Sequence, residues 1–292
     1  MSGPASPSLG RLAPGRVALL ARARRPRRCC SGKEKVELYR LRSYREPTPD
    51  DLTKNLADTL KQMNGRTTVL EEARALLYSW SGWPVLDRIV EESSEVQIYL
   101  TGGVLRDIFL KSTQAPRDFD FFIGGKEPQL VLEQLSQHGQ LATGPFGSPR
   151  WYPDQDERHA DTVPIPSFYN GLWRCEDIID VLNQFDFTCN ALALDVRTGQ
   201  FFDPQNGSRA ISRRLMQAVR FDYPEEPILP GQVLTRNAVL WFRILHYAAA
   251  RGLKIESVTL RWLRNHARYR KQATQFEAAF FPLHPAYLDP VN

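Results

Sequence analysis

The sequence predicts an α+β fold in which short strands and helices alternate in the middle of the chain and helices follow. Two apolar runs, VQIYLTG and DFDFFI, have the length and composition of strands, and VLRDIFL between them has the spacing of a short helix. Farther along, FTCNALALDVRTGQFFDP carries the turn sequence Arg197-Thr198-Gly199 between two apolar stretches, which predicts a hairpin. Hairpin strands mixed with helices favour α+β over a doubly wound parallel sheet.

Further elements are predicted by the same signals. PQLVLEQLSQ is typical of a helix that begins at Pro128, ADTVPI of a strand, and residues 176–182 of a short helix. Residues 139–153 are rich in glycine and proline, so we expect a loop there. Past Ser208, apolar residues at helical spacing predict helices in three segments: RAISRRLMQAV, QVLTRNAVLWFRILHYAAARG and ESVTLRWLRNHARYRK.

The chain therefore divides into four predicted regions. Residues 1–46 have no periodic pattern and are expected to form a disordered or targeting tail. Residues 47–95 form a helical lead-in that is interrupted at Gly82-Trp83-Pro84. Residues 96–220 form the core of strands and helices, and residues 221–292 a helical C-terminal part.

The composition is that of an ordinary globular protein, with 42% hydrophobic and 24% charged residues in a chain of 292. The net charge is +5, but residues 1–33 hold seven Arg and one Lys and no acid, so the remainder is net negative. No apolar run approaches the length of a membrane span, and we expect no membrane partner. The four cysteines have the spacing neither of a zinc site nor of a disulfide framework.

The N-terminal tail has two interpretations that the sequence leaves open. Its richness in Arg, Ala and Ser without acids fits a mitochondrial transit peptide, which would place a eukaryotic protein in the matrix. In a bacterial protein, which we would expect to be cytoplasmic, the same residues would be a disordered tail or an overextended start.

Two carboxylates one residue apart are the first sign of chemistry. Side chains at i and i+2 of a strand point to the same side, so Asp118 and Asp120 project together while Phe119 points into the core. Carboxylates this close repel each other, and burial makes both ions costly. A divalent cation removes both costs, and Mg²⁺ prefers carboxylate oxygens together with substrate phosphates. A two-metal site of this kind stabilises the attacking and leaving oxygens of a phosphoryl-type displacement.

The Gly102-Gly103 pair supplies a second element. Glycines allow the backbone to approach a ligand closely, and Arg106 lies one turn into the next helix, within reach of the same anion. Alone, Gly-Gly is most often a turn and Asp-x-Asp a solvated strand end; in this order and spacing they predict a nucleoside triphosphate site. Neither the dinucleotide-binding G-x-G-x-x-G nor a phosphate-binding P-loop sequence comes after a strand here.

These motifs resemble the head domain of class II nucleotidyltransferases, the family of tRNA CCA-adding enzymes and bacterial poly(A) polymerases. YLTGGVLRDIFL is similar to the family's Gly-Gly-x-x-Arg-Asp element and RDFDFFI to its metal-binding strand. A third stretch, FDFTCNALALDVRTGQFFDPQNGSRAISRRLMQAVR, is similar to the family's Asp-Phe-Thr-x-Asn-Ala-Leu segment with its hairpin and helix. The resemblance covers residues 97–253, about half of the chain.

The resemblance implies a fold, a reaction and a set of site residues. The fold would be polymerase-β-like, a small mixed sheet with flanking helices and then a helical neck, so that residues 96–220 would be the nucleotidyltransferase head. The reaction would transfer a nucleotide from an NTP, ATP and/or CTP, to the 3′ end of tRNA or another RNA. Asp118 and Asp120 would hold Mg²⁺, with Asp161 as a third catalytic acid. The nucleotide-binding residues would be Gly102, Gly103, Arg106, Asp107, Asp186, Asn190, Asn237 and Arg243.

The sequence also departs from the family pattern. Where the family has Arg-Arg before Asp-Phe-Thr, this chain has Gln184-Phe185, so a positive contact to the nucleotide is missing unless Arg213, Arg214 or Arg220 replaces it. The base-selecting Glu-Asp-x-x-Arg aligns with a stretch in which Asn237 takes the Asp position and Leu240 the Arg position. Leu cannot form a hydrogen bond to a base, so strict choice of the base is not expected. Fewer residues follow Leu253 than the tRNA-holding body of the family requires.

The last predicted helix carries basic residues at a spacing that allows contact with an RNA backbone, with Trp262 and Tyr269 nearby: Arg261, Arg264, Arg268 and Lys271. A solvated helix face with Trp262 in the core explains the same pattern. For the whole chain, an RNA-directed transferase is the leading hypothesis. The alternatives are a catalytically silent head that binds RNA or nucleotide, and transfer to an acceptor other than RNA.

Overall fold

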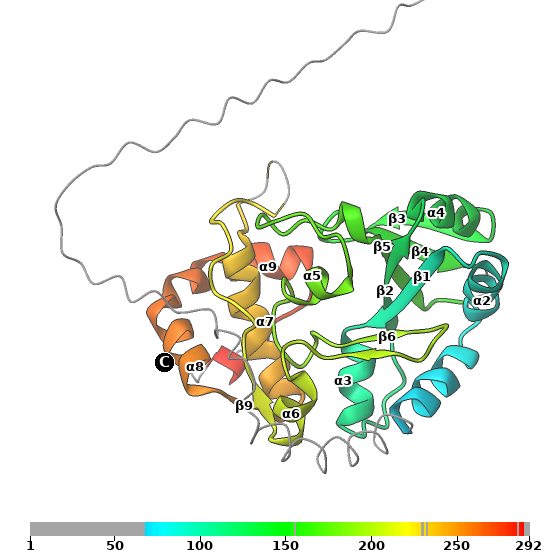
Figure 1. Cartoon of the computed structure of the whole chain (residues 1–292). Coiled ribbons are helices and arrows are strands. Elements are labelled where there is room, and N and C mark those ends of the chain that lie inside the picture. The colour runs from blue at the N-terminus through cyan, green and yellow to red at the C-terminus, as the bar shows by residue number, and fades with distance from the viewer. Residues whose placement is uncertain (1–67, 155, 229–230, 232, 285, 289–292) are drawn as a thin grey trace, which may run out of the picture. The chain divides into compact units, whose positions relative to one another are not determined.

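The computed structural model describes residues 68–288 apart from 155, 229, 230, 232 and 285 (Figure 1). The predicted tail and the first part of the helical lead-in lie outside the described residues. Residues 68–78 are helical, as the spacing of the apolar residues in TVLEEARALLYSW predicts, and α2 (Trp83–Glu92) begins in the Gly-Trp-Pro interruption. None of the described helices is long and apolar enough to cross a membrane.

A seven-stranded sheet occupies the middle of the chain, in the order β3-β4-β5-β2-β1-β6-β7 (Figure 1). Its strands are β1 (Val96–Thr101), β2 (Asp118–Gly125), β3 (Gly139–Thr143), β4 (Pro149–Pro153), β5 (His159–Pro164), β6 (Ala193–Asp195) and β7 (Phe201–Phe202). β2 pairs with β5 in parallel, and the other neighbours are antiparallel. The predicted mixed sheet with flanking helices is confirmed.

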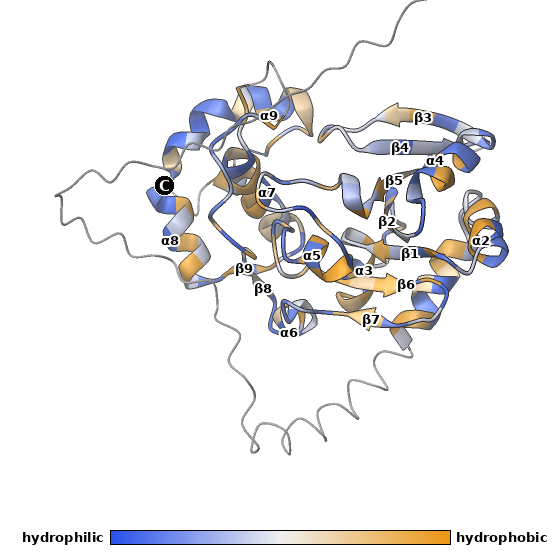
Figure 2. Ribbon diagram, turned by 45° about the horizontal axis from the view of Figure 1, so that its top comes forward, coloured by the Kyte–Doolittle hydropathy of each residue, from blue (hydrophilic) through white to orange (hydrophobic). Residues whose placement is uncertain are grey.

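β2 is the middle strand of the sheet, and both of its faces are covered. Phe119, Phe121 and Ile123 are fully buried against residues 68–78, α2 and α4 (Pro128–Ser136). On the other face Phe122 packs with α5 (Ile178–Leu182). β6 and β7 continue the sheet as hydrophobic strands, orange in Figure 2. Side chains alternate along β2, so Asp118 and Asp120 share one face. Both lie at the open end where the strand begins.

The prediction of a loop at residues 139–153 is wrong, because β3 and β4 form a hairpin there. Gly139 pairs with Pro153 and Thr143 with Pro149, so the glycine and the prolines mark strand ends. Prolines are tolerated near the edge of a sheet, and the buried Trp151 holds β4 against the core. Long-range pairing with β5 decides this segment, and local composition does not show it.

The helical prediction after Ser208 is correct in type but not in extent. The helix predicted over RAISRRLMQAV ends at Ser212, as α6 (Gly207–Ser212). β8 (Leu215–Met216) comes next and pairs in parallel with β9 (Lys254–Ile255), a contact between segments far apart in sequence. The remaining elements are α3 (Gly103–Phe109), η1 (Ile165–Ser167), α7 (Arg236–Ala250), α8 (Ser257–Asn265), η2 (Ala267–Gln272) and α9 (Ala273–Ala279).

α7 joins the C-terminal part to the sheet. Trp241, Phe242 and Ile244 on it are fully buried, and one hydrophobic cluster runs from Val69 to Phe276. Thr235 caps the helix by accepting a hydrogen bond from the Ala238 N–H. The predicted boundary at residue 220 stays a prediction. α7 lies beside the open end of β2 (Figure 1). Residues of both elements line one cleft.

Candidate active site

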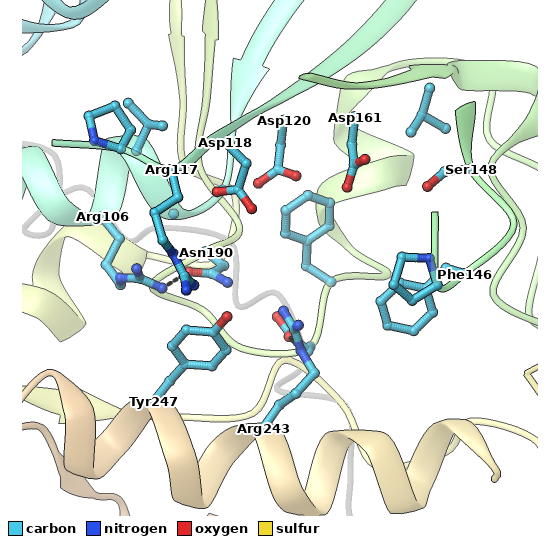
Figure 3. Close-up of a pocket in the computed structure, with 18 of the residues that line it drawn as sticks. Arg106, Arg117, Asp118, Asp120, Phe146, Ser148, Asp161, Asn190, Arg243 and Tyr247 are labelled. Atoms are coloured by element: carbon cyan, nitrogen blue, oxygen red, sulfur yellow. Dashed lines mark hydrogen bonds and ion pairs between the residues drawn. The ribbon is translucent and has the colours of Figure 1, made fainter. Parts of the chain in front are cut away.

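A cleft of about 890 Å³ lies between the open ends of β2 and β5 and the side of α7. Figure 3 shows Asp118, Asp120 and Asp161 projecting from the sheet on one wall, with Arg243 and Tyr247 rising from α7 on the other. The turn before α3, the loop between β3 and β4 and the residues after α9 also line it. Carboxylates therefore face cationic and aromatic groups across a single cavity.

The three acids come together through the parallel pairing of β2 with β5. Asp120 lies opposite Asp161, and Asp118 lies opposite His159. Burial raises the pKa of Asp120 to about 8, and the charges of Asp118 and Asp161 add to this rise. The ionised form of Asp120 is therefore disfavoured in this arrangement.

The Gly102-Gly103 turn is pressed against these acids. Gly102 has φ of 72° and ψ of −136°, a backbone conformation that only glycine adopts readily. A Cβ at this position would lie 2.5 Å from Oδ2 of Asp120, so a side chain has no room. The Thr101 hydroxyl donates to the Asp120 carbonyl at 3.2 Å and holds the two segments together. Strand, turn and carboxylate form one rigid unit.

Arg106 is fixed at the base of α3 by polar partners. It is buried, and its guanidinium donates to Asn190 Oδ1 at 2.9 Å and to Asp107 Oδ1 at 2.8 Å. Arg251 donates to the second Asp107 oxygen at 2.9 Å, and the Arg106 guanidinium lies 5.2 Å from the centre of the Tyr247 ring. Burial disfavours the positive charge of Arg106, but the interaction with Asp107 outweighs the effect of burial and raises the pKa of Arg106. Asn190 and Asp107 therefore orient Arg106.

A second ion pair ties α7 to the segment before β6. Arg243 Nε donates to Asp186 Oδ2 at 2.7 Å, and Asp186 also accepts from the Phe187 N–H. Burial disfavours the Arg243 cation, but Asp186 and the neighbouring charges raise its pKa overall. Asp120 is one of those neighbours, so Arg243 balances charge on both sides of the cleft.

We expect Arg243→Met to destabilise the protein by about 3 kcal/mol, because it leaves Asp186 half-buried without its partner. In the Asp186→Asn/Arg243→Met double variant most of this loss should disappear, since no uncompensated charge remains. Urea unfolding of the wild type, both single variants and the double variant measures the coupling. Additive losses would show that the pair contributes little to the fold.

Several predicted site residues lie elsewhere. Asn237 does not line the cleft: it is buried, and its amide donates to the Tyr223 carbonyl at 2.8 Å and to Glu225 at 3.2 Å. The basic residues of α8 and η2 are exposed but are not among the lining residues: Arg261, Arg264, Arg268 and Lys271. Trp262 and Tyr269, the neighbouring aromatic residues, are buried and belong to the core.

The structure also brings in residues that sequence reasoning missed. Arg150 on β4 binds Asp161 through both oxygens, at 2.7 and 3.1 Å, and this contact raises its pKa. No signal pointed to Arg150, because its segment was predicted to be a loop. Arg117 also lines the cleft, and its position next to Asp118 in the sequence could have indicated this. Arg236 lines the cleft from the first turn of α7.

The two residues that replace the family's Arg-Arg are packed into the fold. The Gln184 side chain donates to the Trp173 carbonyl at 2.9 Å. Phe185 lies 5.8 Å from Phe122, ring centre to ring centre, and packs with the cluster behind it. Arg220, one of the suggested replacements, pairs with Asp222 at 2.6 Å and does not line the cleft. The arginines that line the cleft are on α3, β4 and α7 and at positions 117 and 251.

The carboxylates fit a magnesium site that is completed by substrate. Among the described residues no three His, Cys, Asp or Glu side chains converge as a ready-made metal cluster. Mg²⁺ in phosphoryl-transfer sites commonly uses one or two protein carboxylates and takes its remaining ligands from phosphates and water. Burial and the charges of Asp118 and Asp161 raise the pKa of Asp120, and a cation bound beside these acids would favour its ionised form.

Comparison with known proteins points to one group. The "Multifunctional CCA protein" of Xanthomonas oryzae pv. oryzae is 28% identical over 170 residues, which are 53% of this chain and 39% of that protein. The protein of the same name from Vibrio parahaemolyticus serotype O3:K6 is 28% identical over 179 residues, covering 59% of this chain and 40% of the relative. The predicted resemblance to the class II nucleotidyltransferase head is confirmed. No family model matches the chain.

Solved structures agree on the fold. A CCA-adding enzyme in complex with CTP superposes with a TM-score of 0.52 at 16% identity, over 71% of this chain and 50% of that one. The apo form of a CCA-adding enzyme has a TM-score of 0.50 at 18% identity, over 67% and 44% of the two chains. The chain spans about two fifths of the length of the curated relatives it matches. The likeness to these proteins is therefore a likeness to part of each of them.

Proposed function

We propose that this protein is a Mg²⁺-dependent nucleotidyltransferase that adds a nucleotide from an NTP to the 3′ end of an RNA. The observation that carries the proposal is Asp120 held against the Gly102 turn, with Asp118 on the same strand and Arg243 in the same cleft. A glycine turn can approach the phosphates of a triphosphate closely, and adjacent carboxylates can hold its metal ions. The motifs that resemble tRNA CCA-adding enzymes, together with relatives named "Multifunctional CCA protein", support RNA as the acceptor.

In the proposed reaction the RNA 3′ oxygen attacks the α-phosphorus of the NTP. A bond forms between these two atoms, the bond to the bridging oxygen of the β-phosphate breaks, pyrophosphate leaves, and the hydroxyl proton is released to water. Asp118 and Asp120 would hold Mg²⁺, which supplies positive charge to the transferring phosphoryl group. Arg117 and Arg243 offset the charge of the phosphates, while Asp107 and Asn190 hold Arg106 in place below the turn.

Base selectivity depends on the wall that α7 presents. Val239 and Leu240 line the cleft and are buried, whereas Asn237 turns away from it. An apolar wall distinguishes bases by shape and stacking but offers no hydrogen bond to a base edge. Discrimination of this kind is limited to about 10- to 200-fold.

The test is label transfer with each α-labelled NTP in turn, a pool of small RNAs and Mg²⁺. We expect label on RNA from both ATP and CTP, with efficiencies that differ by no more than about 200-fold. The Asp118→Ala/Asp120→Ala protein, checked for a native circular dichroism spectrum, should transfer none. Label that persists in this variant would show that the reaction does not use these acids.

A silent head that only binds RNA or nucleotide is the second candidate. It is favoured by Phe185 and Leu240, two apolar residues at positions where the family pattern has arginine. Mg²⁺-dependent binding of an NTP without label transfer to any RNA would support it. Transfer to a small molecule or a protein in the absence of transfer to RNA would identify a different acceptor.

A further inference from the structure

One group of cleft residues has no part in the proposed transfer of the nucleotide. Phe146, in the loop between β3 and β4, and Tyr169, after η1, line the cleft and keep 39% and 58% of their surfaces exposed. The Arg236 guanidinium is 6.0 Å from the centre of the Phe146 ring and donates to the backbone carbonyl of Tyr169 at 3.0 Å. We call Phe146, Tyr169 and Arg236 the mouth cluster.

Arg236 is in a position that does not favour a cation. It is the first residue of α7, where the helix dipole repels positive charge. Burial lowers its pKa, and no carboxylate among the described residues pairs with it. A half-buried guanidinium without an acid, open to a cavity, is the arrangement expected at a site for an anion.

The ring of Phe146 and the backbone of Tyr169 are held in place although both side chains are exposed. Phe168 packs its ring on Phe122 with centres 5.1 Å apart, and Asn170 donates to the Gln184 carbonyl at 2.8 Å. The backbone of Tyr169 is therefore fixed on both sides while its ring remains open to the cleft. Phe146 rests on Phe280, with ring centres 5.0 Å apart. Binding a flat ligand to these side chains would cost little ordering entropy.

We propose that the mouth cluster binds an unpaired nucleotide of the RNA acceptor, with its base stacked on Tyr169 and Phe146 and its phosphate on Arg236. Aromatic rings beside arginine are the usual means by which proteins bind single-stranded nucleic acid without reading its sequence. The cluster shares the cleft with Asp118 and Asp120, so a strand bound there leads to the proposed reaction centre. This inference rests on the proposed function, because it assigns the RNA side of the same site.

The test uses a short single-stranded oligoribonucleotide with 2-aminopurine near its 3′ end, whose fluorescence reports stacking. Tyr169→Ala should weaken binding by about 5- to 100-fold and reduce the fluorescence change, and Tyr169→Phe should restore both. Arg236→Ala should lower the slope of log affinity against log salt by about 0.7, the share of one phosphate on a single strand. Tyr169→Ala should leave that slope unchanged.

The matched control is Tyr78→Ala, which removes an exposed ring on residues 68–78, outside the cleft lining, and should change nothing. Affinity for a fluorescent ATP analogue with Mg²⁺, measured alongside, should be the same in all variants. If label transfer to RNA proceeds but Tyr169→Ala and Arg236→Ala bind the oligoribonucleotide like the wild type, the mouth cluster is not an RNA site and the transferase stands. If the wild type binds ATP but no RNA, then RNA is not the acceptor and the mouth cluster is not an RNA site.

Discussion

Replacing Asp120 by Asn is expected to abolish nucleotide transfer and at the same time to stabilise the metal-free protein. Transfer should fall by at least about 1,000-fold, because a metal ion contributes several kcal/mol to the stabilisation of the transition state. The folded protein should gain stability at neutral pH, since the amide carries no charge next to Asp118 and Asp161. A gain in stability with a loss of activity distinguishes a functional acid from a structural one.

The pKa of Asp120 also determines how the stability of the metal-free protein changes with pH. Burial and the neighbouring acids raise the pKa of Asp120 to about 8 in the folded state, against about 4 in the unfolded chain. Between these values the unfolded state loses its proton and the folded state keeps it, so Asp120 makes stability fall as the pH rises from about 4 to 8. Thermal unfolding from pH 5 to 8 without metal should show a shallower decline for Asp120→Asn than for wild type.

The control for this experiment is Asp154→Asn, which changes an exposed acid at the end of β4 outside the cleft lining. Its activity and its pH dependence should match those of the wild type. An Asp120→Asn protein that is less stable than the wild type at pH 8 would mean that the Asp120 carboxylate accepts structural hydrogen bonds that outweigh the repulsion.

Gly102→Ala should cost both stability and activity, whereas Gly103→Ala should cost little stability. At Gly102 the positive φ alone costs about 1–3 kcal/mol for a residue with a side chain. The added Cβ would lie 2.5 Å from the Asp120 carboxylate, so the acid must move, and displacement of this kind costs about 100-fold in rate. At Gly103 the Cβ would meet only the end of the Arg106 side chain, at 3.3 Å.

Urea unfolding and label transfer of the two variants provide the comparison. Alanine is favoured over glycine within a helix by about 0.5–1 kcal/mol, and this offsets the contact at Gly103. Gly103→Ala should therefore stay within about 1 kcal/mol of the wild type. Equal losses for the two variants would show that the whole turn is sensitive to bulk, and that the contact between Gly102 and Asp120 has no special role.

The local part of this architecture could be predicted from the sequence. The period of two in DFDFFI places Asp118 and Asp120 side by side, because alternate residues of a strand share a face. The apolar spacing of α4 and α7 and the hairpin turn near Gly199 depend only on neighbours in the chain, and they are found as predicted. The roles assigned to these residues in binding and catalysis stay predictions.

Tertiary structure decided which distant segments meet. Residues 139–153 form strands because β5 offers an edge to pair with, and that pairing brings Arg150 to Asp161. α7 turns Asn237 into the core and Arg236 into the cleft, since the buried side of the helix is set by packing around Trp241. By itself the sequence determined that the two acids share a strand, that the Gly-Gly turn precedes a short helix, and that α4 and α7 are helical, all of which depend on neighbours in the chain. Arg150 and Arg243 lie far from the two acids in the sequence, and only folding brings them to the same cleft.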